Sequence, residues 1–321
     1  MKNIIFVCKA DKSVGAGHIN RCIALAEYLS RRITMHAIFI TNQDCHKKII
    51  DRGFIPVLPN DVDLASQILS FTPKIVVFDL HKTPEELIMI MKTNLVPTIS
   101  LCYFDDNRGL CDVSISAVKT NRNSDPGYFE GADYVLLCRE YLKGKIKIRR
   151  RATKIFVYAK TPAVYKLMRK VLKNEPFDIT YMTHNHQKDV KWIDYMSDTS
   201  QTLKSCDMAI VPMDSFLFQC LAIGLPTIII SHNNREEECA KRFVNLNAAL
   251  HLGHYKNIKI REAKNMIRKI SHKQAKRKLL QFHSRNMINR ESCNNIYRIY
   301  KKLIGEDPYH GPDVQEVQEL P

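Results

Sequence analysis

Residues 4–29, IIFVCKADKSVGAGHINRCIALAEYL, are the stretch that decides the fold. An apolar, β-branched run over 4–8 predicts a buried strand. Apolar residues at helical spacing over 22–31 predict an amphipathic helix. The turn between them contains Gly15 and Gly17. A strand that passes through a glycine turn into a helix is typical of the first unit of a Rossmann-like domain.

The same alternation of strand and helix continues along the chain. In the first half it predicts strands at 35–41, 74–78, 96–101, 113–117 and 134–137, and helices at 43–52 and 84–92. In the second half it predicts strands at 154–158, 177–182, 208–212 and 227–231, and helices at 163–173, 216–223, from 236, and within 260–303. Strands this continuously apolar are typical of parallel sheets covered by helices on both faces.

The alternation pauses over the basic stretch 142–153, which is poor in core residues. We therefore expect an α/β protein of two Rossmann-like, doubly wound parallel-sheet domains that face each other across a cleft, over 1–145 and 152–305. The remaining segment, 306–321, is acidic and contains three prolines, and we expect a flexible tail. A length of 321 residues also favours two domains.

Composition favours a cytoplasmic globular protein. The chain has 45% hydrophobic and 26% charged residues, and no apolar run approaches the ~20 residues that span a bilayer. Its first apolar run is interrupted by Lys9 and Asp11 and precedes no small-residue cleavage site, so we expect a strand and not a signal peptide. Ten scattered cysteines without a C-x-x-C pair indicate reduced, mostly buried thiols.

The net charge of +16 indicates an anionic partner. Basic residues gather over 143–151 and 256–278. They lack interleaved aromatic residues and any nucleic-acid-binding signature, so we expect no specific nucleic-acid partner. A phosphorylated small molecule and peripheral contact with an anionic membrane both remain open, as does a general anion-attracting surface. The sequence gives no indication of the oligomeric state.

The turn over 15–18 also has residues that can do chemistry. Glycine lets the backbone approach a ligand, and the start of the following helix offers free N–H groups to an anion. His18 at that position can act as a general base or bind substrate. Arg21, one turn later, can reach a phosphate or hold an acidic residue. A purely steric glycine turn explains Gly15 and Gly17 equally well.

The motif G-x-G-H-x-x-R-C over 15–22, followed by Leu25, Ala26 and Leu29, resembles the N-terminus of the UDP-sugar hydrolases of pseudaminic acid biosynthesis. Their relatives include spore-coat polysaccharide biosynthesis proteins and, more distantly, lipid-linked glycosyltransferases of the GT-B fold. Weaker matches follow in the family's order over about 1–255, at Val77-Phe78-Asp79, Asp105-Asp106, Cys111-Asp112-Val113, 131–137 with Tyr141, 206–210, Ser215, 222–227 and Asn233-Asn234.

This resemblance implies a GT-B fold whose second domain holds the uridine diphosphate. It implies a hydrolase that needs neither metal nor cofactor, in which water attacks the anomeric carbon of a UDP-activated sugar. Surface-glycan biosynthesis of the nonulosonic-acid type is the implied context, and a nucleotide sugar is the implied partner. His18 would activate or position the water, with Asp79 or Asp105 as its candidate partner. The implied substrate-binding residues are Gly15, Gly17, Arg21, Ser215, Gln219, Asn233 and Asn234.

The chain departs from the family pattern mainly in the second half. Ala159-Lys160 replaces a glycine pair, and Met213-Asp214-Ser215-Phe216 replaces the Gly-Gly-Ser-Thr loop that contacts the diphosphate. Gln219 replaces a glutamate expected near the ribose, and Cys138 replaces an arginine. Three readings therefore stay open: a hydrolase of this class, a GT-B glycosyltransferase that needs an acceptor, and a non-catalytic relative whose nucleotide site has eroded.

Three smaller patterns have plainer alternatives. His184 and His186 could form part of a metal site, but two ligands without a third indicate a loop, so we expect no metal there. Asp105 and Asp106 could act as a base or bind magnesium, or could cap a turn. Asn234 follows a strand where cleft ligands bind, and a helix cap explains it as well.

Overall fold

The computed structural model describes residues 2–10, 15–60, 62–102, 105–119, 126–183, 190–194 and 196–306. The first domain is built on a parallel sheet of seven strands in the order β3-β2-β1-β4-β5-β6-β7. Its strands are β1 (Lys2–Cys8), β2 (Met35–Ile40), β3 (Ile55–Val57), β4 (Pro73–Asp79), β5 (Thr98–Ser100), β6 (Val113–Ser116) and β7 (Tyr128–Glu130). The helices of this half are α1 (Gly17–Ser30), α2 (His46–Ile50), α3 (Leu64–Ser70), α4 (Glu85–Thr93) and α5 (Arg139–Leu142), with short 3₁₀ turns at Gln43–Cys45, Asp106–Leu110 and Ala132–Tyr134.

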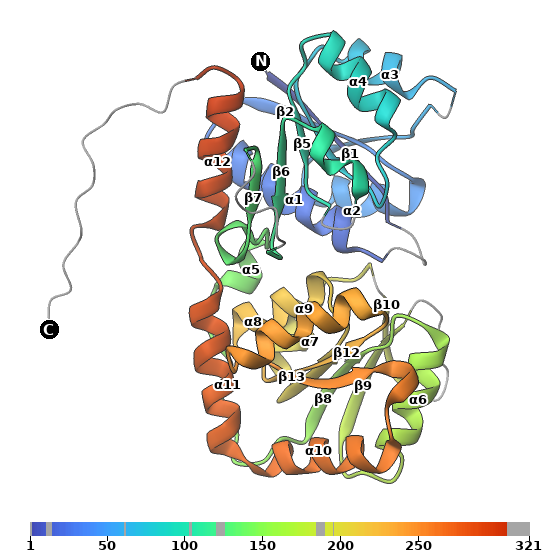
Figure 1. Cartoon of the computed structure of the whole chain (residues 1–321), viewed down its shortest axis with the longest axis vertical. Coiled ribbons are helices and arrows are strands. Elements are labelled where there is room, and N and C mark those ends of the chain that lie inside the picture. The colour runs from blue at the N-terminus through green and yellow to red at the C-terminus, as the bar shows by residue number, and fades with distance from the viewer. Residues whose placement is uncertain are drawn as a thin grey trace, which may run out of the picture.

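The second domain repeats this plan with a parallel sheet of six strands in the order β10-β9-β8-β11-β12-β13. Its strands are β8 (Lys154–Tyr158), β9 (Asp178–Thr183), β10 (Lys191–Asp194), β11 (Met208–Val211), β12 (Thr227–Ser231) and β13 (Leu250–His254). Its helices are α6 (Pro162–Leu172), α7 (Ser200–Ser205), α8 (Ser215–Ile223), α9 (Asn234–Asn245), α10 (Ile260–His272) and α11 (Gln274–Met287), with a 3₁₀ turn at Tyr255–Asn257. Two stacked parallel-sheet domains confirm the architecture expected from the alternation (Figure 1).

The central strands are buried on both faces, which is why they are apolar without alternation. Ile4, Ile5 and Phe6 of β1 are all fully buried, and so are Ile155, Phe156 and Val157 of β8. Side chains on one face of each sheet join a core that runs through both domains, while those on the other face form a separate core in each domain. The expectation of buried thiols is also confirmed, because all ten cysteines are buried.

The strand expected over 134–137 is wrong. Val135, Leu136 and Leu137 are buried but pair with no strand, and the seventh strand of the sheet is β7 instead. Their apolar character comes from packing at the boundary of the two domains, where they line a cavity. Apolar pattern alone does not distinguish a strand from an extended segment that is buried by packing.

The last helix, α12 (Ser292–Leu303), returns to the first domain. Figure 1 shows α11 beside the second sheet and α12 beside the first. Tyr297 packs against Tyr28 of α1, and Asn289 and Asn295 donate hydrogen bonds to Asp133. The unit expected over 152–305 thus extends its last helix across to the first sheet and ties the two domains together. Of the tail, the structure describes only Glu306, which forms an ion pair with Lys2.

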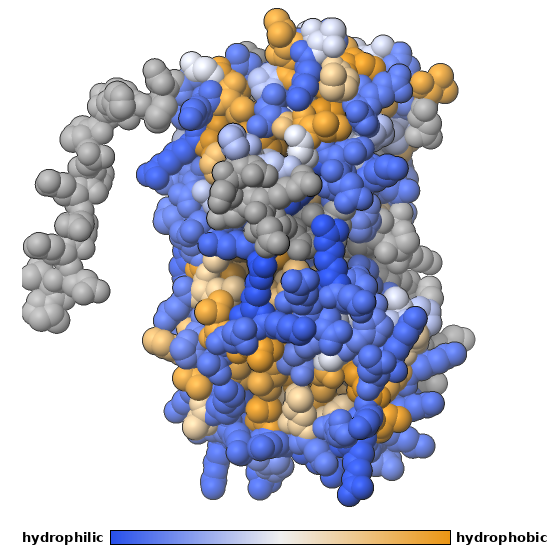
Figure 2. Space-filling view, viewed as in Figure 1, coloured by the Kyte–Doolittle hydropathy of each residue, from blue (hydrophilic) through white to orange (hydrophobic). Residues whose placement is uncertain are grey.

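One face of the molecule, seen in Figure 2, is dominated by hydrophilic residues with apolar residues between them. The basic character expected from the sequence is visible locally on α10, where Arg261, Lys264 and Lys269 alternate with buried apolar positions. Within the part of the chain that the structure describes, no helix is both long and apolar enough to cross a membrane.

Candidate functional site

The candidate site lies at the point in each sheet where the chain stops adding strands on one side and begins to add them on the other. In the first sheet the chain leaves β1 toward β2 on one side and later returns to β4 on the other. In the second sheet the chain leaves β8 toward β9 on one side and later returns to β11 on the other. Such a switch point leaves a crevice at the carboxyl ends of the strands, where ligands of open α/β sheets bind.

A cavity of about 100 Å³ joins the two switch points. It takes polar residues from both domains and apolar residues mainly from the first. Its polar and charged lining residues are His18, Arg21, His81, Cys102, Ser116, Lys160, Asp214 and Ser215. Its apolar wall includes Leu101, Val118, Val135, Leu136, Leu137, Tyr158, Met213, Phe216 and Phe218.

The first domain contributes a buried triad of His18, Asp79 and Arg21. Gly15, at φ 82°, turns the chain so that α1 starts at Gly17 and presents His18 to the end of β4. His18 Nδ1 lies 2.6 Å from Asp79 Oδ1. Arg21 donates to both oxygens of the same carboxylate, from Nε at 3.0 Å and from a terminal nitrogen at 2.7 Å. The sequence predicted His18, Arg21 and Asp79 as candidates, and the structure brings all three together.

The electrostatics of this triad keep the carboxylate charged. Asp79 is fully buried, and burial alone would raise its pKa. The Arg21 guanidinium and His18 outweigh that effect and hold the pKa of Asp79 below its ordinary value. An ionised Asp79 favours the tautomer with the proton on Nδ1 of His18, because the short contact then becomes a charge-assisted hydrogen bond. Nε2 is then the ring nitrogen with a lone pair for chemistry.

The second domain contributes Asp214 and Ser215 at the start of α8. Asp214 is the N-cap of that helix, and its carboxylate accepts a 2.9 Å hydrogen bond from the Phe216 N–H. Burial raises the pKa of Asp214 to about 7, against the opposing effects of Lys160 and of the hydrogen bond from Phe216. Asp214 is therefore only partly ionised at neutral pH. Its charge would therefore oppose a phosphate in the cavity less than a fully ionised carboxylate would.

The two domains are in contact directly over the glycine turn. A Cβ added to Gly17 would lie 2.8 Å from Ser215 Oγ, so the first turn of α1 faces the first turn of α8 at close range. This contact explains why residue 17 has no side chain. It also keeps the cavity well below the ~300–1,000 Å³ of pockets that enclose drug-sized ligands.

Sequence reasoning missed His81 as a site residue and named Cys102 only as a buried thiol. His81 follows β4 by two residues, and its ring centroid lies 5.2 Å from that of His18. Cys102 follows β5 by two residues and is 2% exposed. Their positions in the sequence could have indicated a site, because each residue lies just after the carboxyl end of a strand. His81 follows β4, which pairs with β1, and Cys102 follows β5, which pairs with β4.

Asp105 lies outside the cavity. It caps the 3₁₀ turn at Asp106–Leu110, where its carboxylate accepts from the Asn107 N–H at 3.0 Å. It also accepts from the backbone N–H and the hydroxyl of Thr83. With its oxygens engaged in this way, Asp105 fits the turn-capping alternative and not the role of a partner for His18.

Gln219, Asn233 and Asn234 also lie outside the lining of the cavity. Gln219 is buried inside α8, with no hydrogen-bond partner for Oε1 among the described residues. Asn233 is the N-cap of α9 and accepts from the Glu236 N–H at 2.8 Å, while Asn234 is the first residue of the helix. They border a separate surface hollow with His232, Arg235 and His254. The histidines at 184 and 186 lie outside the described residues.

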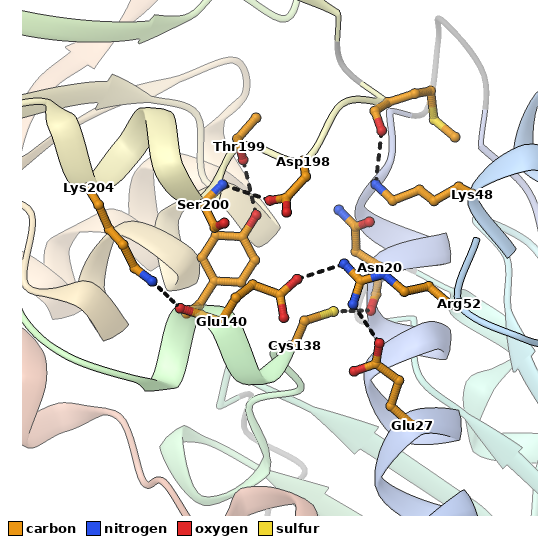
Figure 3. Close-up of polar contacts among 12 residues, drawn as sticks. Asn20, Glu27, Lys48, Arg52, Cys138, Glu140, Asp198, Thr199, Ser200 and Lys204 are labelled. Carbon is orange, nitrogen blue, oxygen red and sulfur yellow. Dashed lines mark hydrogen bonds and ion pairs between the residues drawn. The ribbon is translucent and has the colours of Figure 1, made fainter.

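A polar junction beside the cavity connects the two domains (Figure 3). Arg52, after α2, forms ion pairs with Glu27 of α1 at 2.5 Å and with Glu140 of α5 at 2.7 Å. From the other domain, Lys204 of α7 donates to the Glu140 carbonyl at 2.6 Å. Lys48 of α2 donates to the Met196 carbonyl at 3.1 Å. The Lys204 and Lys48 contacts cross from one domain to the other, while the two ion pairs of Arg52 lie within the first domain.

Cys138 lies in this junction. Its thiol donates to the carbonyl of Asn20 on α1 at 3.8 Å (Figure 3). Burial, reinforced by Glu140 and Glu27, raises the pKa of Cys138 to about 12. The residue that stands in place of an arginine is therefore a neutral packing group, and the nearby cation is Arg52.

Comparisons with known proteins identify relatives of the chain and structures that share its fold. No protein-family model matches the chain. The chain is 26% identical over 279 residues to the spore coat polysaccharide biosynthesis protein SpsG of Bacillus subtilis, with 74% of this chain and 80% of that protein covered. It is 21% identical over 291 residues to an uncharacterised protein of Methanocaldococcus jannaschii, with 78% of this chain and 60% of that protein covered.

Solved structures with the same architecture include several glycosyltransferases. MurG of Acinetobacter baumannii superimposes with a TM-score of 0.65 at 9% identity, covering 94% of this chain and all of that one. The spinosyn forosaminyltransferase SpnP gives 0.67 at 11% identity, with 95% and 100% covered. MnaA of S. aureus, solved with UDP, gives 0.67 at 12% identity, with 96% and 99% covered. These likenesses establish the two-domain GT-B fold.

Proposed function

We propose that this protein is a nucleotide-sugar hydrolase of polysaccharide biosynthesis that releases UDP from a UDP-activated amino sugar. The observation that carries the proposal is the His18–Asp79–Arg21 triad at the first switch point, opposite the start of α8. The relation to SpsG supports the pathway class. The fold shared with UDP-bound MnaA supports a nucleotide in the cavity.

In the proposed reaction, His18 acts as the general base. Asp79 holds the ring by Nδ1, so Nε2 takes a proton from water as the water oxygen bonds to the anomeric carbon. The bond from that carbon to the β-phosphate oxygen breaks, and its electron pair leaves with UDP. Fixing the imidazole and stabilising its protonated form are what a buried carboxylate does for such a base.

The leaving diphosphate would be held by cations and by the start of α8. Lys160 and Arg21 both border the cavity and supply positive charge. Ser215, the first residue of α8, offers a hydroxyl and a backbone N–H next to the positive end of the helix dipole. Lys160 stands where the related hydrolases have glycine. Its ammonium group would therefore stabilise the charge of the diphosphate in place of a backbone contact.

The test is UDP release from UDP-activated amino sugars without an acceptor. We expect His18→Ala to lower the rate by about a hundredfold or more, which is the usual contribution of a general base. The exposed His36, at the start of β2, provides a matched control, and His36→Asn should retain the wild-type rate. Unchanged release by His18→Ala would refute the assigned role.

A glycosyltransferase is the second candidate, and the apolar wall of the cavity favours it. Leu101, Val118 and Leu136 come from the first domain, where an acceptor would bind in this fold, and they suit an apolar acceptor better than water. The two functions differ in one requirement. A transferase releases UDP only when an acceptor is present, whereas a hydrolase releases it without one. A protein whose nucleotide site has eroded would release no UDP and would bind none at millimolar concentration.

A further inference from the structure

Helices α10, α11 and α12 carry most of the net positive charge of the chain. Residues 256–302 contain fifteen lysines and arginines and only two acidic residues, Glu262 and Glu291, against a net charge of +16 for the whole sequence. The three helices are described throughout, and none of their residues lines the cavity between the domains. The proposed reaction therefore leaves this concentration of charge unexplained.

One face of α11 is fixed against the protein by hydrogen bonds to backbone carbonyls. Arg277 donates to the carbonyl of Arg149 at 2.6 Å, and Gln281 donates to that of Ile146 at 2.9 Å. Leu280, between them in the sequence, is only 1% exposed. These contacts hold the helix at a defined rotation about its axis, so the opposite face is turned to solvent.

The outer face of α11 presents two large apolar side chains. Phe282 is 61% exposed and Leu279 is 42% exposed. They are three residues apart on a helix and therefore lie next to each other on one face. Lys278 is exposed one turn before Phe282. Figure 2 shows apolar patches among hydrophilic side chains along this flank of the molecule, where α11 and α12 follow one another in Figure 1.

The cations around these two side chains have no carboxylate partners. Lys273, Lys278 and Arg298 are exposed, and none of them forms an ion pair with another residue that the structure describes. Arg268 of α10, in contrast, is paired with Glu175 at 2.6 Å. Surface cations without an internal partner keep their attraction for anions outside the molecule.

We propose that the outer flank of α11 and α12 docks on an anionic membrane surface. Phe282 and Leu279 enter the interfacial layer, and Lys273, Lys278 and Arg298 lie against the lipid head groups. Bulky apolar side chains surrounded by lysine and arginine are typical of helices that bind in the plane of a membrane interface. The proposal does not depend on the hydrolysis proposed above.

The charge of this flank argues against two other occupants. A second copy of the same flank would bring like charges together and is disfavoured for that reason. The backbone of a nucleic-acid duplex would pair with the cations but would give Leu279 and Phe282 no apolar environment. Lipid supplies both the negative charge and the apolar layer that these side chains match.

The test is co-sedimentation of the full chain with phosphatidylcholine vesicles, with and without about a third of phosphatidylglycerol. We expect binding to the anionic vesicles alone, and its loss as salt rises from ~0.05 to ~0.5 M, because salt screens exposed charges. Phe282→Ser should weaken binding by about tenfold or more. Lys278→Glu should weaken it by about fivefold or more. Met89→Ser and Lys92→Glu are the matched controls and should bind as the wild type does, because both residues are exposed on α4 of the first domain.

A second measurement distinguishes insertion from purely electrostatic adsorption. Trp192 is the single tryptophan of the chain, so Phe282→Trp in a Trp192→Phe background reports on position 282 alone. We expect its fluorescence to shift to shorter wavelength on anionic vesicles. An unshifted spectrum would mean that residue 282 stays in water and would contradict the proposed insertion.

Three results of the sedimentation would overturn the docking site: no binding to anionic vesicles, binding that Phe282→Ser leaves unchanged, or an equal loss in the α4 controls. Salt-sensitive binding to duplex DNA in place of vesicles would assign the flank to a nucleic acid. UDP release measured without vesicles should be the same for Phe282→Ser and the wild type. The docking site and the proposed hydrolysis can therefore fail separately.

Discussion

At the scale of single residues, the site depends on two carboxylates with opposite pKa shifts. Asp79 is buried beside Arg21 and His18, which keep its pKa low and its charge in place. Asp214 is held across the cavity, and burial raises its pKa to about 7. The first charge is needed to orient His18. The second lies where a diphosphate would bind and is partly removed by protonation at neutral pH.

Asp214→Asn should therefore strengthen UDP binding in a pH-dependent way. Above pH 7 the wild-type carboxylate is charged and repels the diphosphate, whereas below pH 7 it is protonated and resembles asparagine. We expect the variant to bind UDP about tenfold more tightly at pH 8, a difference of ~1.4 kcal/mol, and almost equally at pH 6. Asparagine is also a good N-cap, so α8 should keep its start.

Calorimetric titration of both proteins at the two pH values checks this expectation. Comparing the variant with the wild type at each pH cancels the titration of UDP itself. An affinity ratio that is the same at pH 6 and pH 8 would mean that Asp214 does not titrate in this range or does not face the nucleotide.

At the scale of elements, the first turns of α1 and α8 meet end to end. Gly17 begins one helix and Ser215 the other, and a Cβ at residue 17 would lie 2.8 Å from Ser215 Oγ. Each helix follows the strand at the switch point of its own sheet. Both helix starts therefore point their free N–H groups into the same small space, which suits an anion that bridges the two domains.

The variants Gly17→Ala and Ser215→Ala should be strongly coupled. In the wild-type background the new Cβ of residue 17 lies 2.8 Å from Ser215 Oγ, so the Ser215 side chain must rotate or the helix ends must separate. In the Ser215→Ala background that oxygen is gone. We expect Gly17→Ala to lower the free energy of unfolding in the first background and not in the second, with a coupling energy of about 1 kcal/mol or more. Urea unfolding of the four proteins measures this coupling, and additive effects would show that the helix ends are not in contact.

The sequence predicted the elements that depend on local pattern and missed those that depend on packing. The run over 4–8 and the glycine turn gave β1 and α1, because a continuous apolar strand and a helical spacing are local properties. Val135 and Leu137 were misread as a strand, since burial at the domain boundary produces the same pattern. His81 and Cys102 were missed because their proximity to His18 depends on strand order, which a single chain does not reveal.

At the scale of the whole molecule, the function depends on how the two domains are held. The cavity of about 100 Å³ is smaller than a nucleotide sugar, so the part of such a ligand that it does not hold would extend beyond it. Two structures span the boundary: α12, which returns from the second half to the first sheet, and the contacts of Lys204 with Glu140 and of Lys48 with Met196. Together they hold the two domains in contact.

Arg52→Ala should destabilise the first domain at its boundary with the second. Its removal leaves Glu27 and Glu140 partly buried without their shared cation. We expect the free energy of unfolding to fall by about 1–3 kcal/mol, as for other hydrogen bonds to charged groups. Arg31→Ala is the matched control, because Arg31 lies 3.8 Å from the same Glu27 and is half exposed, and its removal should cost less than about 0.5 kcal/mol. Urea unfolding of both variants distinguishes them, and equal losses would assign no special role to the junction.

The most direct test of the proposed hydrolysis is to run the reaction in ¹⁸O-labelled water and to measure by mass spectrometry how much ¹⁸O the released sugar and the UDP contain. If water activated by His18 attacks the anomeric carbon, one labelled oxygen appears in the released sugar and none in UDP. Label in UDP would mean that the phosphorus is attacked, and UDP release that occurs only with an acceptor would mean that the protein transfers the sugar. Either of these two results would contradict a hydrolase built on the triad of His18, Asp79 and Arg21.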